Sequence, residues 1–272
     1  MPQTPPSRRG VVHRGSPTPP AEEDSFARVA SFYDELMASI PYHSWADYVE
    51  QVMDHYEVRP QEILDVACGT GTVSMILAQR GYQVVGTDLS APMIKVAQEK
   101  AAQAGLELPF HAQDAAAMKF KGKFDLAICL YDSLNYVLED DHLLAAFKAV
   151  RRALRPGGFF FFDLNGLHAF EAELFTQESP PGVVPGYRWQ SRFNPFTSIA
   201  EVEMHFEPPT GKPFTITHRQ RAYLVDEVVE LLNKARFEVL NLFEAYTLLP
   251  PGRYSERIFY MARKPEARRK KA

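Results

Sequence analysis

The sequence predicts an α/β fold in which helices cover both faces of a largely parallel sheet. An apolar run at residues 63–67 leads into a turn with two glycines, a helical pattern follows, and a second apolar run ends on Asp88. Apolar runs and helical patterns then alternate as far as residue 164. Such alternation indicates strand–helix–strand units, whose parallel strands are buried on both faces. A chain of 272 residues is long enough for one such domain with an insertion.

The first unit, residues 62–88, is the most informative stretch. The run at 63–67 is too short for a helix and rich in branched side chains, which favours a buried strand. Gly69 and Gly71 then allow a tight turn and a close approach of the backbone to a ligand. Apolar positions recur at helical spacing until Gly81, which is expected to end the helix.

Two acids flank this turn. Asp88 lies 19 residues after Gly69, close to the position where nucleotide-binding folds place the acid that binds ribose hydroxyls, roughly 20 residues on. The turn lacks the third glycine of a dinucleotide fingerprint, because Ser74 stands there. Asp65 ends the strand before the turn, and a carboxylate there disfavours a pyrophosphate and favours a cationic ligand. The pattern therefore argues against a nicotinamide dinucleotide.

The remaining elements follow from periodicity, caps and turn residues. Residues 25–57 are expected to form an N-terminal helical arm, with one helix at 26–38 and a second from Ser44 to about Tyr56. Residues 178–224 change to alternating polar and apolar positions, which predicts a small antiparallel sheet inserted after the fifth strand as a lid or wall. In order, the other expected elements are a helix from Ser90 to Ala104, strands at 107–112 and 124–130, a helix at 140–154, a strand at 159–164, a helix at 226–235, and an antiparallel pair at 237–247 and 254–263.

The order of residues around the turn resembles the class I S-adenosylmethionine (SAM) dependent methyltransferases. The pattern is Asp65-x-Ala67-Cys68-Gly69-x-Gly71 followed by Asp88, and the turn at 154–158, Leu-x-Pro-Gly-Gly, is a second similarity. SAM carries an ammonium and a sulfonium but no phosphate, in agreement with the charges at the turn. The resemblance extends over residues 25–264 and implies a Rossmann-like, doubly wound sheet of seven strands. Segments 33–37, 132–136 and 218–221 are similar to a bacterial branch of these enzymes whose substrates are unassigned.

The resemblance also implies which residues bind SAM and its product S-adenosylhomocysteine. An acid after the third strand is expected near the adenine amino group, and Asp114 matches. A tyrosine of the N-terminal arm is expected to fold over SAM, and Tyr33 matches, although it could equally belong only to the apolar stripe of the arm. The expected cofactor-binding residues are Tyr33, Asp65, Ala67, Cys68, Gly69, Gly71, Asp88, Leu89, Met93, Gln113, Asp114, Ala115 and Leu130.

Candidates for the acceptor side lie on the loop after the fourth strand and on the inserted sheet. Ligands of open α/β sheets lie beyond the carboxyl ends of strands, so this loop should face the transferred methyl group. His218 would suit proton removal near neutral pH, and Arg221 would suit an anionic group. Strand alternation places these two on opposite faces, and an exposed structural role is an alternative for each. The candidate catalytic residues are His218, Tyr131, Asp132, Asn135 and Arg221.

Composition limits the class of protein further. Residues 1–24 are rich in proline and expected to be disordered, and 265–272 form a basic tail that could contact RNA or be a solvated end. Without residues 1–24 and 263–272, 21 basic and 30 acidic groups remain, which argues against a broad nucleic-acid surface. The chain has only two cysteines, which favours a reducing cytoplasm over a disulfide framework. No apolar run is long enough for a membrane span. No cluster of residues has metal-ligand spacing, so no metal is expected.

The sequence therefore predicts a cytoplasmic SAM-dependent methyltransferase, a monomer or homodimer, acting at N or O of a small molecule by in-line displacement. The loop after the fourth strand lacks the Asp/Asn-Pro-Pro-Tyr/Phe sequence of many enzymes that methylate nucleic-acid amino groups. An RNA-modifying methyltransferase is one alternative. A SAM-binding regulatory protein without turnover is another, and a nicotinamide oxidoreductase is the most distant.

Overall fold

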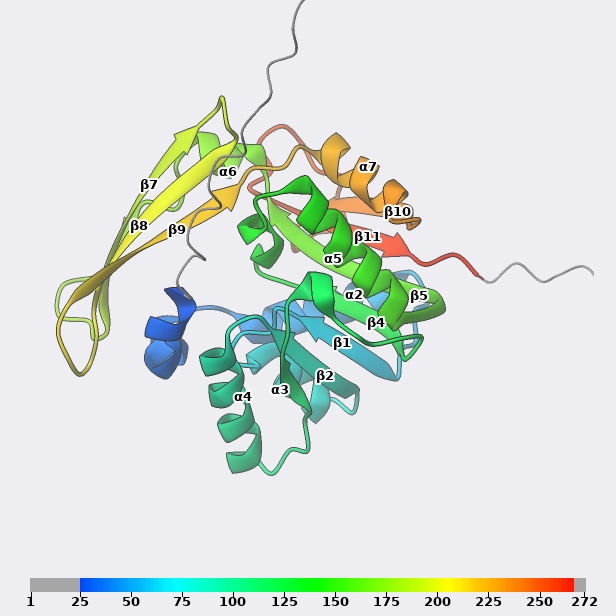
Figure 1. Cartoon of the computed structure of the whole chain (residues 1–272), viewed down its shortest axis with the longest axis horizontal. Helices are drawn as coiled ribbons and strands as arrows, with labels where there is room; N and C mark the ends of the chain where they lie inside the picture. Colours follow the sequence, from blue (N-terminus) through cyan, green and yellow to red (C-terminus); the bar gives the residue numbers. More distant parts are fainter. Residues whose placement is uncertain (1–24, 267–272) are drawn as a thin grey trace, which may run out of the picture.

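A seven-stranded sheet forms the centre of the protein (Figure 1). The computed structural model describes residues 25–266. The strand order is β10-β11-β5-β4-β1-β2-β3; β1 to β5 pair in parallel, and β11 is antiparallel to both β5 and β10. This confirms the predicted doubly wound sheet. Its strands are β1 (Glu62–Val66), β2 (Gln83–Asp88), β3 (Phe110–Ala112), β4 (Phe124–Cys129), β5 (Leu154–Asn165), β10 (Glu238–Glu244) and β11 (Arg257–Arg263).

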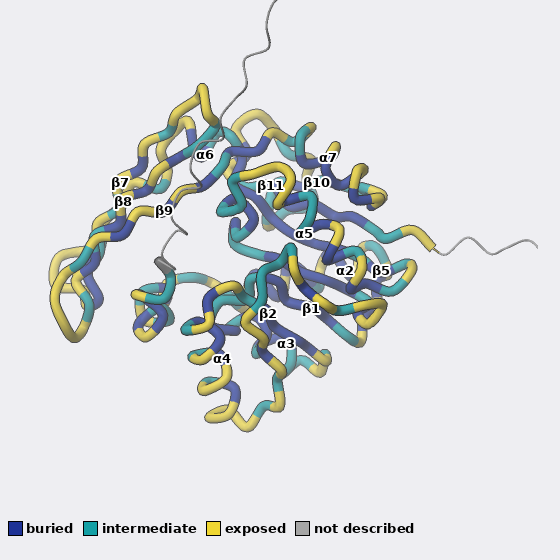
Figure 2. The backbone as a smooth tube through the Cα atoms, viewed as in Figure 1, coloured by how far each residue is buried: buried dark blue, intermediate teal, exposed yellow. Residues whose placement is uncertain are grey.

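Helices cover both faces of this sheet, and the strands between them are buried (Figure 2). Side chains that are adjacent in a strand point to opposite faces. Leu64 and Phe162 therefore pack with α5 and α7 on one face, whereas Ile63 and Phe161 pack with α2 and α3 on the other. The helices are α2 (Tyr42–His55), α3 (Thr72–Gln79), α4 (Ala91–Gln103), α5 (Asp140–Ala153) and α7 (Val225–Lys234).

The inserted sheet is antiparallel, with the order β6-β7-β8-β9. Alternate residues of β8, from Ala200 to Phe206, are buried, which is the pattern of a sheet with one covered face. Val202, Met204 and Phe206 pack against Val29 and Phe32 of the N-terminal arm. The arm thus lies between the inserted sheet and the main sheet. The strands are β6 (Gln177–Glu178), β7 (Gly186–Asn194), β8 (Ile199–Glu207) and β9 (Phe214–Arg221), preceded by the short helix α6 (Leu167–Glu171).

The arm differs from the prediction of one helix at 26–38. The structure has three short pieces instead, η1 (Ser25–Arg28), η2 (Ala30–Phe32) and α1 (Tyr33–Leu36). None of the pieces for which a cap is defined has a side-chain cap at its start. Because Val29 and Phe32 pack under the inserted sheet while Tyr33 lines cavities near the main sheet, the chain changes direction within one apolar stripe. A single straight helix would present this stripe to one side only.

Other boundaries also differ. The fifth strand begins at Leu154 rather than at residue 159, so it includes the predicted turn at 154–158, and the last strand begins at Arg257 rather than at 254. The third strand begins at Phe110 rather than at residue 107, because Pro109 has no N–H to donate to a strand partner. The second arm helix begins at Tyr42, two residues before the predicted cap Ser44. The predictions for residues 1–24 and for the basic end at 267–272 lie outside the described residues. In the described part of the chain, no helix is both long and apolar enough to span a bilayer.

Candidate active site

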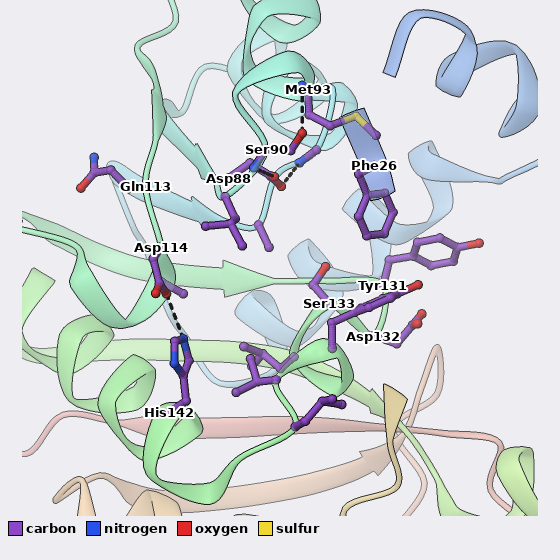
Figure 3. Close-up of a pocket in the computed structure, with 18 of the residues that line it drawn as sticks. Phe26, Asp88, Ser90, Met93, Gln113, Asp114, Tyr131, Asp132, Ser133 and His142 are labelled. Atoms are coloured by element: carbon purple, nitrogen blue, oxygen red, sulfur yellow. Dashed lines mark hydrogen bonds and ion pairs between the residues drawn. The ribbon is translucent and has the colours of Figure 1, made fainter. Parts of the chain in front are cut away.

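A cavity lies at the carboxyl ends of the parallel strands (Figure 3). This main cavity has a volume of about 440 Å³. Its wall is formed by the glycine turn after β1, by the ends of β2 and β3, by the loop after β4, and by the N-terminal arm. The strand order brings these segments to one edge of the sheet, where ligands of open α/β sheets bind.

The glycine turn is fixed by its backbone conformation. Gly69 and Gly71 have φ values of +56° and +76°, which favour glycine. A Cβ atom on Gly71 would also lie 2.7 Å from the Phe110 ring, so only hydrogen fits there. A Cβ atom on Gly69 would meet nothing within 4 Å. Gly69 therefore exposes open backbone to the main cavity, and Gly71 packs the turn against β3.

Asp88 connects this turn with α4. Its carboxylate oxygens accept hydrogen bonds from the Gly69 N–H and the Ser90 N–H, both at 2.8 Å. Ser90 caps α4 as predicted, because its Oγ accepts from the Met93 N–H at 3.5 Å. These contacts hold the Asp88 side chain at the cavity wall, beside the apolar side chain of Leu89, which is 75% exposed.

Asp65 lies deeper, in a narrow cavity of about 60 Å³ beside Gly69. Only 3% of the residue is exposed, and its carboxylate accepts a hydrogen bond of 2.5 Å from Ser74 Oγ. Burial raises the pKa of Asp65 to about 7, the Ser74 hydrogen bond lowers it, and the charge of Asp88 raises it further. A cationic group in the narrow cavity would stabilise the ionised carboxylate.

The arm is attached to the glycine turn through Asp34. Thr70 Oγ1 donates to Asp34 Oδ1 at 2.6 Å, and Lys100 Nζ of α4 pairs with Asp34 Oδ2 at 2.6 Å. Lys100 also donates to Thr72 Oγ1 at 2.9 Å. The contacts of Asp34 keep its neighbour Tyr33 at the walls of the main cavity and the narrow cavity.

Asp114 stands after β3, as predicted. Its Oδ1 accepts from the Ala116 N–H at 2.8 Å and lies 3.2 Å from His142 Nε2 of α5 (Figure 3). His142 also lines the main cavity, and the sequence alone gave no sign of this role. Among the described residues, no group of three His, Cys, Asp or Glu side chains could hold a metal ion.

A further cavity, the sheet-side cavity, lies between the arm, the loop after β4 and the inner face of the inserted sheet. Its volume is about 120 Å³, and Phe26, Tyr33, Tyr131, Asp132 and Tyr136 line both this cavity and the main one. The two cavities therefore meet at the loop after β4. The arm contributes to the walls of both.

Arg257 of β11 fixes that loop. Its guanidinium pairs with Asp132 Oδ1 at 2.8 Å and with Asp163 Oδ1 at 2.7 Å. Asp163 also accepts from the backbone N–H groups of Tyr131 (3.0 Å) and Asp132 (2.6 Å), two residues with positive φ. Burial raises the pKa of Asp132, and the charge of Arg257 opposes this. The loop thus depends on one partly buried cation and two buried acids.

His218 faces the sheet-side cavity. Its Nδ1 lies 3.2 Å from the Tyr136 hydroxyl, and burial lowers its pKa to about 4, so the ring is neutral near pH 7. Gln220 shares this face, as strand alternation predicts, and its Nε2 donates to Asp132 Oδ2 at 2.7 Å. Tyr131, Asp132 and His218 are therefore brought together at this cavity.

Asn135 and Arg221 lie elsewhere. Asn135 is fully buried, donates to the Arg221 carbonyl at 2.8 Å and accepts from the Asn165 N–H at 2.9 Å. Arg221 pairs with Asp140 at 2.9 Å on the opposite face of β9 from His218. Neither residue lines the main or the sheet-side cavity.

Comparisons with known proteins agree with this geometry. A family model described as "Methyltransferase domain" matches residues 63–158. The Bacillus subtilis protein named "Putative methyltransferase YqeM" is 34% identical over 241 residues, which are 86% of this chain and 95% of that protein. The chain belongs to the class I SAM-dependent methyltransferases. Its structure is similar to that of a SAM-dependent methyltransferase from Clostridium acetobutylicum, with a TM-score of 0.78 and 28% identity over 89% of this chain and 99% of the other.

A more distant structure shares only the fold. The SAM-bound amino pentose methyltransferase CalS10 from Micromonospora echinaspora has a TM-score of 0.64 and 18% identity, over 85% of this chain and 96% of CalS10. SAM is the cofactor of the present chain, as it is in the rest of the class I family.

In this methyltransferase, the residues expected from the sequence to bind SAM divide between two cavities. Gly71 lines neither, because it serves the packing of the turn. The sequence did not point to Phe26, Ser133 or His142, which also line the main cavity. Those on the main cavity are Tyr33, Ala67, Gly69, Asp88, Leu89, Met93, Gln113, Asp114 and Ala115, and those on the narrow cavity are Tyr33, Asp65, Ala67, Cys68, Gly69 and Leu130.

Proposed function

We propose that this methyltransferase transfers the methyl group of SAM to a nitrogen or oxygen atom of a small molecule. The observation that carries the proposal is the meeting of the main cavity and the sheet-side cavity at the loop after β4. One cavity can hold the cofactor while the other holds an acceptor at its edge. SAM supplies an activated methyl group on its sulfonium, and an in-line displacement then needs mainly correct positioning of the acceptor.

The residues around the main and narrow cavities fit SAM chemically. Asp88, fixed beside the open backbone of Gly69, suits the ribose hydroxyls. Asp114 suits the adenine amino group, because a carboxylate accepts hydrogen bonds. Asp65 suits the ammonium of the methionine part of SAM. Its buried carboxylate accepts a hydrogen bond from the neutral Ser74 hydroxyl, and a cation beside it would stabilise its ionised form.

On the acceptor side, we assign positioning roles to most of the candidate residues. Tyr131 and Asp132 form the boundary between the two cavities, and Arg257 holds them there. Asn135 and Arg221 support the loop and strand from behind. His218 is neutral and contacts Tyr136, so it can exchange a hydrogen bond with the acceptor.

A cytoplasmic location and a monomeric or dimeric state are part of the proposal. Cys68 and Cys129 are both free thiols, as expected for cysteines in a reducing compartment. The alternative of RNA modification depended on the basic end of the chain, which lies outside the described residues. The alternative of a regulatory protein without turnover is tested by acceptor-dependent formation of S-adenosylhomocysteine.

Replacing Asp88 with alanine should weaken SAM binding by about 1–3 kcal/mol, the usual cost of leaving buried polar groups without partners. Isothermal titration calorimetry with SAM and S-adenosylhomocysteine measures this directly. Asp88→Asn keeps one acceptor oxygen and should lose less affinity. Asp54→Ala, at an exposed ion pair near the end of α2, is the matched control and should bind SAM like the parent protein. A folded parent protein that does not bind SAM would refute the proposal.

SAM affinity should also depend on pH below neutrality. Asp65 has a pKa of about 7 in the free protein, and an ammonium beside it would lower that pKa in the complex. Binding would then release a proton below pH 7, so affinity should fall by up to about tenfold for each pH unit lost. Calorimetry between pH 5.5 and 7.5 in buffers of different ionisation enthalpy measures both effects. An affinity that is constant across this range would contradict the assignment of Asp65.

A further inference from the structure

We infer that the sheet-side cavity selects an uncharged, single-ring acceptor that carries both hydrogen-bond acceptors and a hydrogen-bond donor, and that Trp189, His218 and Gln220 recognise these groups. The inference rests on the proposed function and names the chemical class of the molecule to be methylated.

Three polar atoms that belong to residues lining this cavity have no partner. They are Trp189 Nε1, His218 Nε2 and Gln220 Oε1, each fully shielded from solvent and without a hydrogen bond among the described residues. His218 and Gln220 are only 5% and 3% exposed. Buried polar atoms in native proteins are nearly always paired, and each exception needs a cause. Three such atoms around one cavity indicate a ligand that completes their hydrogen bonds.

The contacts of Gln220 decide which of these atoms donate. Gln220 Nε2 faces the Asp132 carboxylate at 2.7 Å, and a carboxylate only accepts, so the amide orientation is fixed with Oε1 left over. The Tyr136 hydroxyl lies 3.2 Å from His218 Nδ1, and a phenolic O–H is the natural donor to the nitrogen of a neutral imidazole.

The contact with the Tyr136 hydroxyl sets the tautomer of His218. With Nδ1 accepting from Tyr136, the neutral ring carries its proton on Nε2. The cavity therefore offers two donors, the indole N–H of Trp189 and the Nε2–H of His218, and one acceptor, Gln220 Oε1. A base at His218 would require the opposite tautomer. A complementary ligand has two acceptor atoms and one donor.

Size and charge restrict the ligand further. The cavity volume of about 120 Å³ is comparable to a cavity of roughly 150 Å³ that holds benzene, so it accommodates one six-membered ring. The walls include aromatic and apolar side chains such as Phe26, Phe206 and Met204. The charged groups that line it, Asp132 and Arg257, are paired with each other at 2.8 Å. Arg257 also pairs with Asp163, and Asp132 also accepts from Gln220, so a charged acceptor would find both groups engaged and would lose its hydration.

Single-ring probes test the inference on the full chain, with and without saturating S-adenosylhomocysteine. Glutarimide has two carbonyl acceptors and one N–H donor, 2-pyridone has one of each, and toluene has neither; benzoate and benzylammonium add a charge. The indole N–H resonance of Trp189, identified by its loss in Trp189→Phe, reports binding in ¹⁵N-labelled protein. We expect glutarimide to bind at least tenfold more tightly than toluene, 2-pyridone to be intermediate, and the charged rings to bind most weakly.

Variants separate recognition from folding. Trp189→Phe keeps an aromatic wall but removes one donor, and should weaken glutarimide about tenfold in ligand-observed NMR while leaving toluene unchanged. Gln220→Leu should do the same. Arg219→Gln, on the outer face of the same strand, is the matched control and should change neither. Equal binding of glutarimide and toluene, or no effect of Trp189→Phe, would overturn the inference.

The failure of this inference is distinct from the failure of the proposed function. If the parent protein binds SAM but no ring, the inference fails while the proposed function stands. If the folded parent protein does not bind SAM, the proposed function is refuted.

Discussion

Replacing Asp65 with asparagine is expected to abolish tight SAM binding and, in the same variant, to stabilise the unliganded protein. Burial raises the pKa of Asp65 from 3.8 to about 7. A difference of one in pKa between the folded and unfolded states corresponds to about 1.36 kcal/mol, so ionised Asp65 costs the folded state up to roughly 4 kcal/mol above pH 7. Asparagine can still accept the Ser74 hydrogen bond and carries no charge.

The pH window follows from the direction in which this pKa moves. A carboxyl whose folded pKa lies above its unfolded value binds more protons in the folded state between about pH 4 and 7. The parent protein should therefore lose stability as pH rises through this window, and Asp65→Asn should not. Thermal melts at pH 5 and pH 8 measure the difference, which should be larger at pH 8. Asp54→Asn, at an exposed ion pair near the end of α2, is the control, because it should neither weaken SAM binding nor stabilise the protein. An unchanged melting temperature for Asp65→Asn at pH 8 would show that Asp65 carries no such cost.

Replacing Arg257 with methionine should be the most damaging substitution near the site. It leaves Asp132 and Asp163 buried without a cation, and breaking such a buried ion pair costs about 3–5 kcal/mol. The loop after β4 should then lose its conformation, because Asp163 holds the N–H groups of Tyr131 and Asp132. Urea unfolding measures the loss of stability, and SAM titration measures the effect on the site.

The loss should depend on pH in a defined direction. Arg257 opposes the burial that raises the pKa of Asp132. Without it this pKa rises further in the folded state, so Arg257→Met should be least stable at high pH and recover partly in acid. Arg257→Met combined with Asp163→Asn should also recover part of the stability. Arg155→Met, at a half-exposed ion-pair cluster with Glu62 and Asp125, is the comparison and should lose much less. Equal losses at Arg257 and Arg155 would contradict the importance assigned to the buried cluster.

The sequence predicted the parts of the molecule whose signals are local. The unit from β1 to β2 combines an apolar run, two glycines with positive φ and an acid at fixed spacing, all within residues 62–88. The inserted sheet was predicted from its alternation, which persists because one face packs against the arm. Ser90 was predicted as a cap because capping depends on the next three residues only.

The remainder depends on contacts between distant segments. Arg257 lies 125 residues from Asp132 and 94 from Asp163, and no local pattern connects them. The broken course of the arm results from packing against β8, which overrides the helical spacing of its apolar residues. Asn135 and Arg221 matched the expected segments, yet the structure places both behind the sheet-side cavity, because their side chains bond to the protein rather than face open space.

The arm has one consequence for how ligands are handled. Phe26 and Tyr33 line the main cavity and the sheet-side cavity alike, so filling either space alters a boundary of the other. Two ligands that share a wall are thermodynamically linked, and the linkage is reciprocal. Whatever factor the cofactor applies to the affinity of the acceptor, the acceptor applies the same factor to the affinity of the cofactor.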